Sequence, residues 1–233
     1  MNTSTASTSH APASTFVPAV IDGSKWSALE PLYSQLVGRT IHDCSALERL
    51  LLDRSELDAA AEESAANLYI QMTRHTDDEL ARKRYLDFVE NVEPELKKIG
   101  FALDRKIAEC PFAQQLDQQR YSVLLRSLRR SVEMFCEVNI PIETEVTKLD
   151  QQYSEINGAM TVTFDGAERT LPQMARYLEE TDRPRRQASW EAVSARRLND
   201  VDRINDIFDH MLAHRHQMAL NGGYSNFRDF QHA

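Results

Sequence analysis

The sequence has only three cysteines, Cys44, Cys110 and Cys136, and no CxxC pair. Thiols that are odd in number and widely separated are typical of a reducing compartment, and they argue against a disulfide framework. The chain also has only 7 glycines, and none of them forms a phosphate-binding loop, a GxGxxG fingerprint or a GxSxG elbow. The patterns typical of nucleotide-binding proteins and of serine hydrolases are therefore missing.

Positive charge is scarce as well, with 27 Lys and Arg against 36 Asp and Glu, so the net charge is −9. Nucleic acids and acidic membranes bind clustered Lys and Arg, and neither is expected as a partner. No run approaches the roughly 18 apolar residues that span a bilayer, so we expect no membrane segment and a cytoplasmic location. Residues 1–24 contain no Lys or Arg and no apolar core, and they are expected to be a disordered tail rather than a targeting signal.

What the chain does have, from Trp26 onward, is helical periodicity, with apolar residues three and four positions apart. Thr76-Asp77-Asp78-Glu79 has the form of a capping box. The predicted helices cover residues 26–36, 44–53, 55–72, 76–92, 94–109, 111–137 and 140–157, with a short helix from Pro172 and a long one from Asp182 that Gly222-Gly223 ends.

One segment, Met160 to Leu171, breaks this period, because β-branched and aromatic residues alternate around Asp165-Gly166. That pattern predicts a tight β-hairpin. The expected fold is therefore mainly α, an antiparallel helical bundle with one small β-hairpin near residues 160–171. The expected organisation is a tail (1–24), an N-terminal helical domain (25–157) and a second domain that starts with the hairpin and the long helix (158–233).

The one candidate for a metal site is His210 and His214, four residues apart on the predicted long helix, with His216 nearby. A zincin helix has the pattern HExxH, but Met211 stands where its general-base Glu would be, and no third ligand is evident. The alternative, polar residues on an ordinary helix, is favoured. Acidic pairs such as Glu62-Glu63 point in different directions and cannot flank one bond. No catalytic, cofactor-binding or metal-binding residue is assigned.

Several short segments, taken in order, resemble the N-terminal part of the oligoendopeptidase F family, relatives of thimet oligopeptidase. The segments are Trp26 to Leu36, Leu68 to Thr73, Thr76 to Asp78, Tyr85 to Glu90, Val162 to Gly166, Thr170 to Pro172, Asp182-Arg183, Ala188 to Trp190, Arg215 to Ala219 and Gly223 to Phe230. The resemblance implies a helical zinc metallopeptidase that hydrolyses short peptides in a deep channel. It also implies that the HExxH motif and a distal Glu lie beyond Phe230.

On this interpretation the chain lacks the catalytic half, is inactive alone and binds no zinc itself, and zinc and short peptides belong to the full-length protein. Apolar side chains at Phe227, Phe230 and part of the stripe from Trp190 to Leu212 should then be exposed or poorly packed. The alternative is a stand-alone helical module that binds a peptide or a protein without catalysis.

Overall fold

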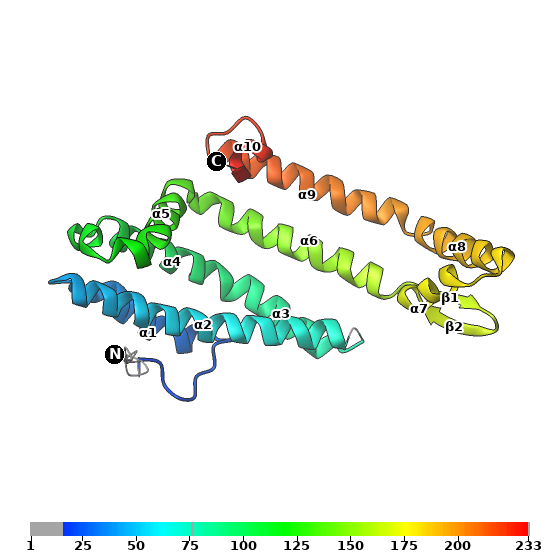
Figure 1. Ribbon diagram of the computed structural model, residues 1–233, viewed down its shortest axis with the longest axis horizontal. Helices are drawn as coiled ribbons and strands as arrows, with labels where there is room; N and C mark the ends of the chain where they lie inside the picture. The colour runs from blue at the N-terminus through cyan, green and yellow to red at the C-terminus, as the bar shows by residue number, and fades with distance from the viewer. Residues whose placement is uncertain (1–15, 76, 233) are drawn as a thin grey trace, which may run out of the picture. The chain divides into compact units, whose positions relative to one another are not determined.

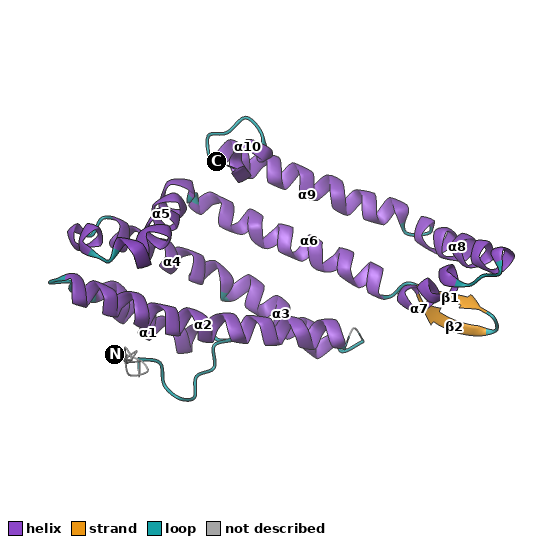
Figure 2. Ribbon diagram, in the orientation of Figure 1, coloured by secondary structure: helices purple, strands orange, loops and turns teal. Residues whose placement is uncertain are grey.

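The computed structural model describes residues 16–75 and 77–232, which form helices and one pair of strands (Figures 1 and 2). The helices are α1 (Trp26–Gly38), α2 (Cys44–Arg74), α3 (Glu79–Asn91), α4 (Glu93–Ala108), α5 (Gln118–Met134), α6 (Ile140–Gly158), α7 (Leu171–Ala175), α8 (Arg183–Leu198), α9 (Val201–Asn221) and α10 (Phe227–His232). Short 3-10 helices cover Pro111–Gln115, Glu137–Asn139 and Arg176–Glu179. The mainly helical fold expected from the sequence is confirmed.

The hairpin is also confirmed, with β1 (Thr161–Phe164) and β2 (Ala167–Thr170) antiparallel and Thr161 opposite Thr170. Asp165 and Gly166 both adopt positive φ, 51° and 72°, which a two-residue turn between twisted strands requires. Thr170 then caps α7 through a capping box with Gln173. The hairpin therefore leads directly into the next helix.

Some helix boundaries differ from the prediction. The region from Cys44 to Arg74 is one helix, not two, because it contains no Gly or Pro and Leu50 and Leu57 are both fully buried along it. The start of α3 is capped by the carboxylate of Asp78, which accepts from the N–H groups of Leu80 and Ala81. Thr76, the predicted cap, lies outside the described residues.

Two predicted long helices are each divided. The one expected over residues 111–137 is a 3-10 turn followed by α5, since Asp117 accepts from Gln119 N–H and starts a new helix. The one expected from Asp182 onward is broken between α8 and α9 at Asn199-Asp200. Asp117 thus competes with the helix for a backbone N–H group, whereas the carboxylate of Asp200 pairs with Arg196 and Arg203.

The chain divides into two compact units, and the first contains residues 16–67 and 98–133 of the described chain. Its core is formed by fully buried aliphatic side chains: Leu29, Leu36, Leu47, Leu50, Leu57, Leu103 and Ile107. Within it, Tyr33 Oη donates to Asp58 (2.7 Å), and Lys106 donates to the backbone oxygens of Val37 (2.5 Å) and Arg39 at the end of α1. Lys106 thus satisfies carbonyl groups that a helix end leaves free.

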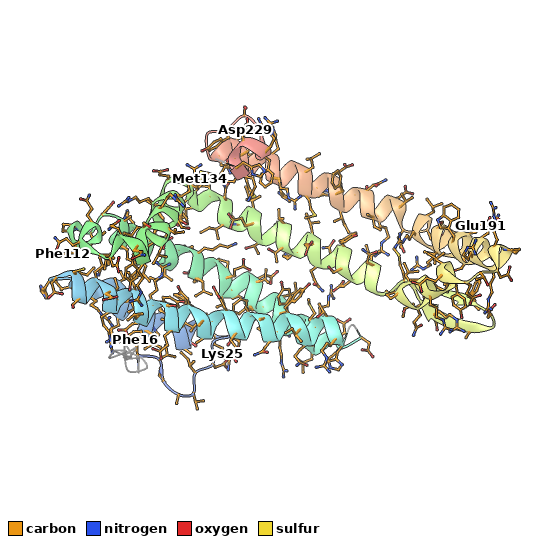
Figure 3. The ribbon with its side chains drawn as sticks, in the orientation of Figure 1. Phe16, Lys25, Phe112, Met134, Glu191 and Asp229 are labelled. Carbon is orange, nitrogen blue, oxygen red and sulfur yellow. The ribbon has the colours of Figure 1, made fainter. Side chains whose placement is uncertain are left out.

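The segment before α1 also belongs to this unit. Val17 N–H donates to Glu56 (3.3 Å), and the guanidinium of Arg39 lies 5.2 Å from the centroid of the Phe16 ring, a residue labelled in Figure 3. Residues 1–15 of the expected tail lie outside the described residues. The expected boundary near residue 158 stays a prediction.

The second unit contains residues 68–97 and 134–232 of the described chain. In it, α6 and α9 run side by side in opposite directions (Figure 1), and Ile156, Met160 and Ile207 form the buried contact between them. Asn139, just before α6, donates to Met218 O (3.0 Å) and accepts from Asn221 (2.8 Å) near the end of α9. These contacts fix both ends of the α6–α9 pair.

A charged groove as the candidate functional site

A groove with a volume of about 750 Å³ lies within the second unit, along α6 and α9. Leu149, Ile156 and Ile207 contribute its apolar lining. The rest of the lining is mostly ionisable: Arg82, Glu145, Glu155, Arg196, Asp200, Arg203, Asp206, His210 and His214. Charges of both signs therefore line the groove.

The spacing of these residues explains why they share one side of α9. Arg203, Asp206, His210 and His214 follow one another at intervals of three or four, so they form a row along the helix. Of this row, only His210 and His214 were candidates from the sequence. The same helical periodicity, applied to charged rather than apolar residues, could have indicated Arg203 and Asp206.

Asp200 is the residue around which one end of the groove is organised. Only 9% of its surface is exposed, and its carboxylate accepts from Arg196 of α8 and from Arg203 Nη1 of α9 (3.3 Å). The hydrogen bond from Arg196 lowers the pKa of Asp200 below its ordinary value, so the group is a carboxylate at neutral pH. Two guanidinium groups thus share one negative charge; we call Arg196, Asp200 and Arg203 the arginine fork.

A third arginine, Arg82 of α3, also lines the groove and forms ion pairs with Glu155 of α6 and with Glu79 (3.6 Å). Glu155 also accepts from Gln151 (3.2 Å). Arg82 and Glu155 therefore compensate each other's charge, unlike the arginine fork, in which the cations outnumber the carboxylate.

His210 and His214 both line the groove, while His216 is exposed and does not. Nδ1 of His210 lies 2.7 Å from the backbone oxygen of Asp206, a contact in which the ring nitrogen must be the donor. Among the described residues, no group of three or more His, Cys, Asp or Glu side chains could hold a metal ion. The absence of zinc from the isolated chain stays a prediction.

The opposite side of α9 carries exposed apolar residues. Phe208 and Leu212 are 59% and 55% exposed, and they precede His210 and His214 by two residues, about 200° around the helix. Trp190 on α8 is 61% exposed. We call the exposed residues Trp190, Leu198, Val201, Phe208 and Leu212 the apolar stripe.

The expected exposure is thus confirmed for the apolar stripe but only in part for Phe227 and Phe230. Both are half-buried, with 6.0 Å between their ring centroids, and Phe230 also packs edge-on against Tyr224 at 5.6 Å. Tyr224 Oη in turn donates to Sδ of Met134 (3.4 Å), the last residue of α5, which Figure 3 labels. These aromatic side chains pack on one another.

The cysteines are not joined by disulfides: Cys44, Cys110 and Cys136 are all free thiols of intermediate exposure. Among the described helices, none is both long enough and apolar enough to cross a lipid bilayer.

Comparison with known proteins gives the class of this fold. The structure is similar to that of PZ peptidase A with an inhibitor (21% identity, TM-score 0.83) and to one assigned as oligoendopeptidase F (22%, 0.84), each over 92% of this chain. A structure assigned as oligoendopeptidase F from Bacillus anthracis is similar over 91% of this chain (17%, 0.83). The chain spans 38%, 38% and 39% of the lengths of those proteins. The fold is thus similar to that of one part of these longer proteins.

A family model also matches part of the sequence. Residues 21–135, just under half of the chain, match the model of the peptidase M3 N-terminal domain. The resemblance to the oligoendopeptidase F group is thereby confirmed. A search of curated proteins gave no match.

Proposed function

We propose that this chain forms the N-terminal part of a zinc-dependent oligoendopeptidase that hydrolyses short peptides, and that it is inactive without the catalytic half of the family fold. The match of residues 21–135 to the M3 N-terminal domain is the observation that carries this proposal. The structural likeness over 92% of the chain to PZ peptidase A supports it, because the likeness continues past residue 135.

The apolar stripe is a second support. Its large side chains on α8 and α9 are more than half exposed at Trp190, Phe208 and Leu212. A row of exposed apolar side chains marks a surface that a partner covers. The family fold supplies that partner, since the similar structures extend well beyond the part that this chain covers. We propose that the catalytic half packs on the stripe.

In this proposal the chain contributes a channel wall rather than reacting groups. Zinc, when bound in the catalytic half, would activate the attacking water. No step of hydrolysis is assigned to a residue of this chain, because its described His, Cys, Asp and Glu side chains do not form a metal site. The cytoplasmic location and the lack of nucleic-acid partners belong to the same proposal.

The second candidate is a stand-alone module that binds peptides without catalysis. The groove of about 750 Å³ favours it, because charged and apolar side chains line one elongated site within a single unit. Such a module would bind peptides with no dependence on zinc.

The test compares the purified 233-residue chain with the product of the complete reading frame that contains it. Zinc content and cleavage of an internally quenched fluorescent peptide are measured for both. One equivalent of zinc and chelator-sensitive cleavage in the longer product alone is the expected result. Zinc-dependent cleavage by the 233-residue chain would show that His210 and His214 form a metal site after all, and no cleavage by either would favour the binding module.

A further inference from the structure

The break between α8 and α9 creates the arginine fork. Asn199 ends α8 and Asp200 precedes α9, so Arg196 and Arg203 approach one carboxylate from two different helices. The side chain of Arg203 is 69% exposed and that of Arg196 is 26% exposed. Both arginines line the groove, and their remaining N–H donors are available to a ligand there.

The charges around the fork favour a small carboxylate over a polyanion. At the fork two guanidinium groups face one carboxylate, which leaves one positive charge in excess. Farther along the groove lie Asp206 and Glu145, the latter also paired with Lys148 (3.1 Å). A nucleic acid or polyphosphate would meet these carboxylates, whereas a ligand with an anion at one end and a cation at the other would match both parts of the groove.

We propose that the arginine fork binds the C-terminal carboxylate of a short peptide that lies in the groove along α9. Guanidinium groups pair with carboxylates through two parallel N–H···O bonds, and the buried Asp200 fixes the two arginines in place for that role. This inference rests on the proposed function, because it specifies which peptides the channel wall selects.

The length of the groove sets the length of the peptide. Arg203 and His214 are 11 residues apart on α9, which corresponds to about 16 Å of helix. An extended peptide advances at most about 3.5 Å per residue, so about five residues reach from the fork to His214. The free amino group of such a peptide then lies at the His214 end of the groove, whose lining also includes the carboxylate of Glu145. The groove therefore selects short peptides with both ends free.

The test uses the 233-residue chain and two forms of one five-residue Ala and Leu peptide, with a free C-terminus and with a C-terminal amide. Isothermal titration calorimetry should give about tenfold or tighter binding of the free acid, because charge-assisted hydrogen bonds are lost in the amide. The Arg203→Gln variant should lose most of that preference, and Arg203→Lys should keep part of it because the charge remains without the fork geometry.

Arg197→Gln is the matched control, because Arg197 is exposed on the same helix, next to Arg196, but does not line the groove. It should leave the preference unchanged. Circular dichroism confirms that each variant is folded. Equal binding of acid and amide, no binding of either, or an unchanged preference in Arg203→Gln would each overturn the assignment.

The results of this peptide-binding experiment can be distinguished from those of the zinc and cleavage experiment that tests the proposed function. Zinc-dependent cleavage by the longer product, together with equal affinity for acid and amide, would reject the fork and leave the peptidase proposal standing. A preference that depends on Arg203, together with no cleavage by the longer product, would retain the fork in a protein that only binds peptides.

Discussion

Buried polar residues connect the parts of this molecule that position the groove. Asn139 is only 2% exposed, and both ends of its amide are used: Nδ2 donates to Met218 O and Oδ1 accepts from Asn221. A buried amide with both bonds made specifies how two helices align, because any shift would leave polar atoms without partners. Asn139 therefore fixes the relative position of α6 and α9 at the end opposite the arginine fork.

Replacement of this amide has a measurable cost. Asn139→Ala removes both bonds and leaves the Asn221 amide without its acceptor, so the free energy of unfolding should fall by about 1–3 kcal/mol. Urea denaturation followed by circular dichroism measures the change. The control is Asn205→Ala on the exposed surface of α9, which should change stability by less than about 0.5 kcal/mol. Equal midpoints for the two variants would contradict this role.

At the scale of elements, the segment before α1 contacts α2 through a site that admits only glycine. A Cβ atom at Gly23 would lie 2.5 Å from Ser64 Oγ and 2.6 Å from the backbone oxygen of Ala60. Ser64 can rotate, but the Ala60 oxygen belongs to the backbone of α2 and cannot move alone. The close approach of this segment to α2 therefore depends on the missing side chain.

Gly23→Ala should accordingly lower stability by about 1–3 kcal/mol, because the segment must move away from α2. Thermal unfolding followed by circular dichroism measures the effect. Gly38→Ala is the control, since a Cβ added there, in the last turn of α1, would meet nothing within 4 Å apart from its chain neighbours and the backbone of its own helix. That change should be neutral or slightly stabilising. A drop in Tm for Gly38→Ala as large as that for Gly23→Ala would disprove the packing argument.

Some of the helices and strands could be predicted from the sequence, and others could not. The hairpin was predictable because Asp165-Gly166 and the alternation before it are local signals, and so was α6, between Ile140-Pro141 and Asn157-Gly158. The continuity of α2 and the break at Asp200 were not. Ser55 is typical of a helix N-cap when the sequence is taken alone, and no Gly or Pro stands at Asn199-Asp200 to mark a break in the long helix.

The candidate site was predictable only in part for a similar reason. His210 and His214 were candidate metal ligands from their spacing, yet in the part of the chain that the structure describes they line a groove without a third ligand placed to complete a site. Arg82 comes from α3, more than a hundred residues earlier in the chain, and no periodicity along α9 could have indicated it. Local patterns predict the faces of helices, whereas a site built from four helices depends on their packing.

At the scale of the whole molecule, the apolar stripe should be detectable in solution. The isolated chain is expected to bind the dye ANS, which fluoresces on exposed apolar surfaces. The double variant Phe208→Ser and Leu212→Ser should lower that fluorescence while the helical content stays the same. Leu80→Ser, at an exposed position on α3, is the control and should have little effect. Unchanged fluorescence in the double variant would exclude the stripe as the binding surface.

The second unit is discontinuous in sequence, because residues 98–133 of the first unit separate its two parts. On a ribosome, α3 therefore emerges well before α6, with which it forms the Arg82–Glu155 and Glu90–Lys148 ion pairs. Glu155 is made 73 residues after Arg82, which takes about 4–15 s at ordinary rates of translation. For those seconds the face of α3 that meets α6 is uncovered. The order of synthesis thus imposes a waiting time on this unit that its finished structure does not reveal.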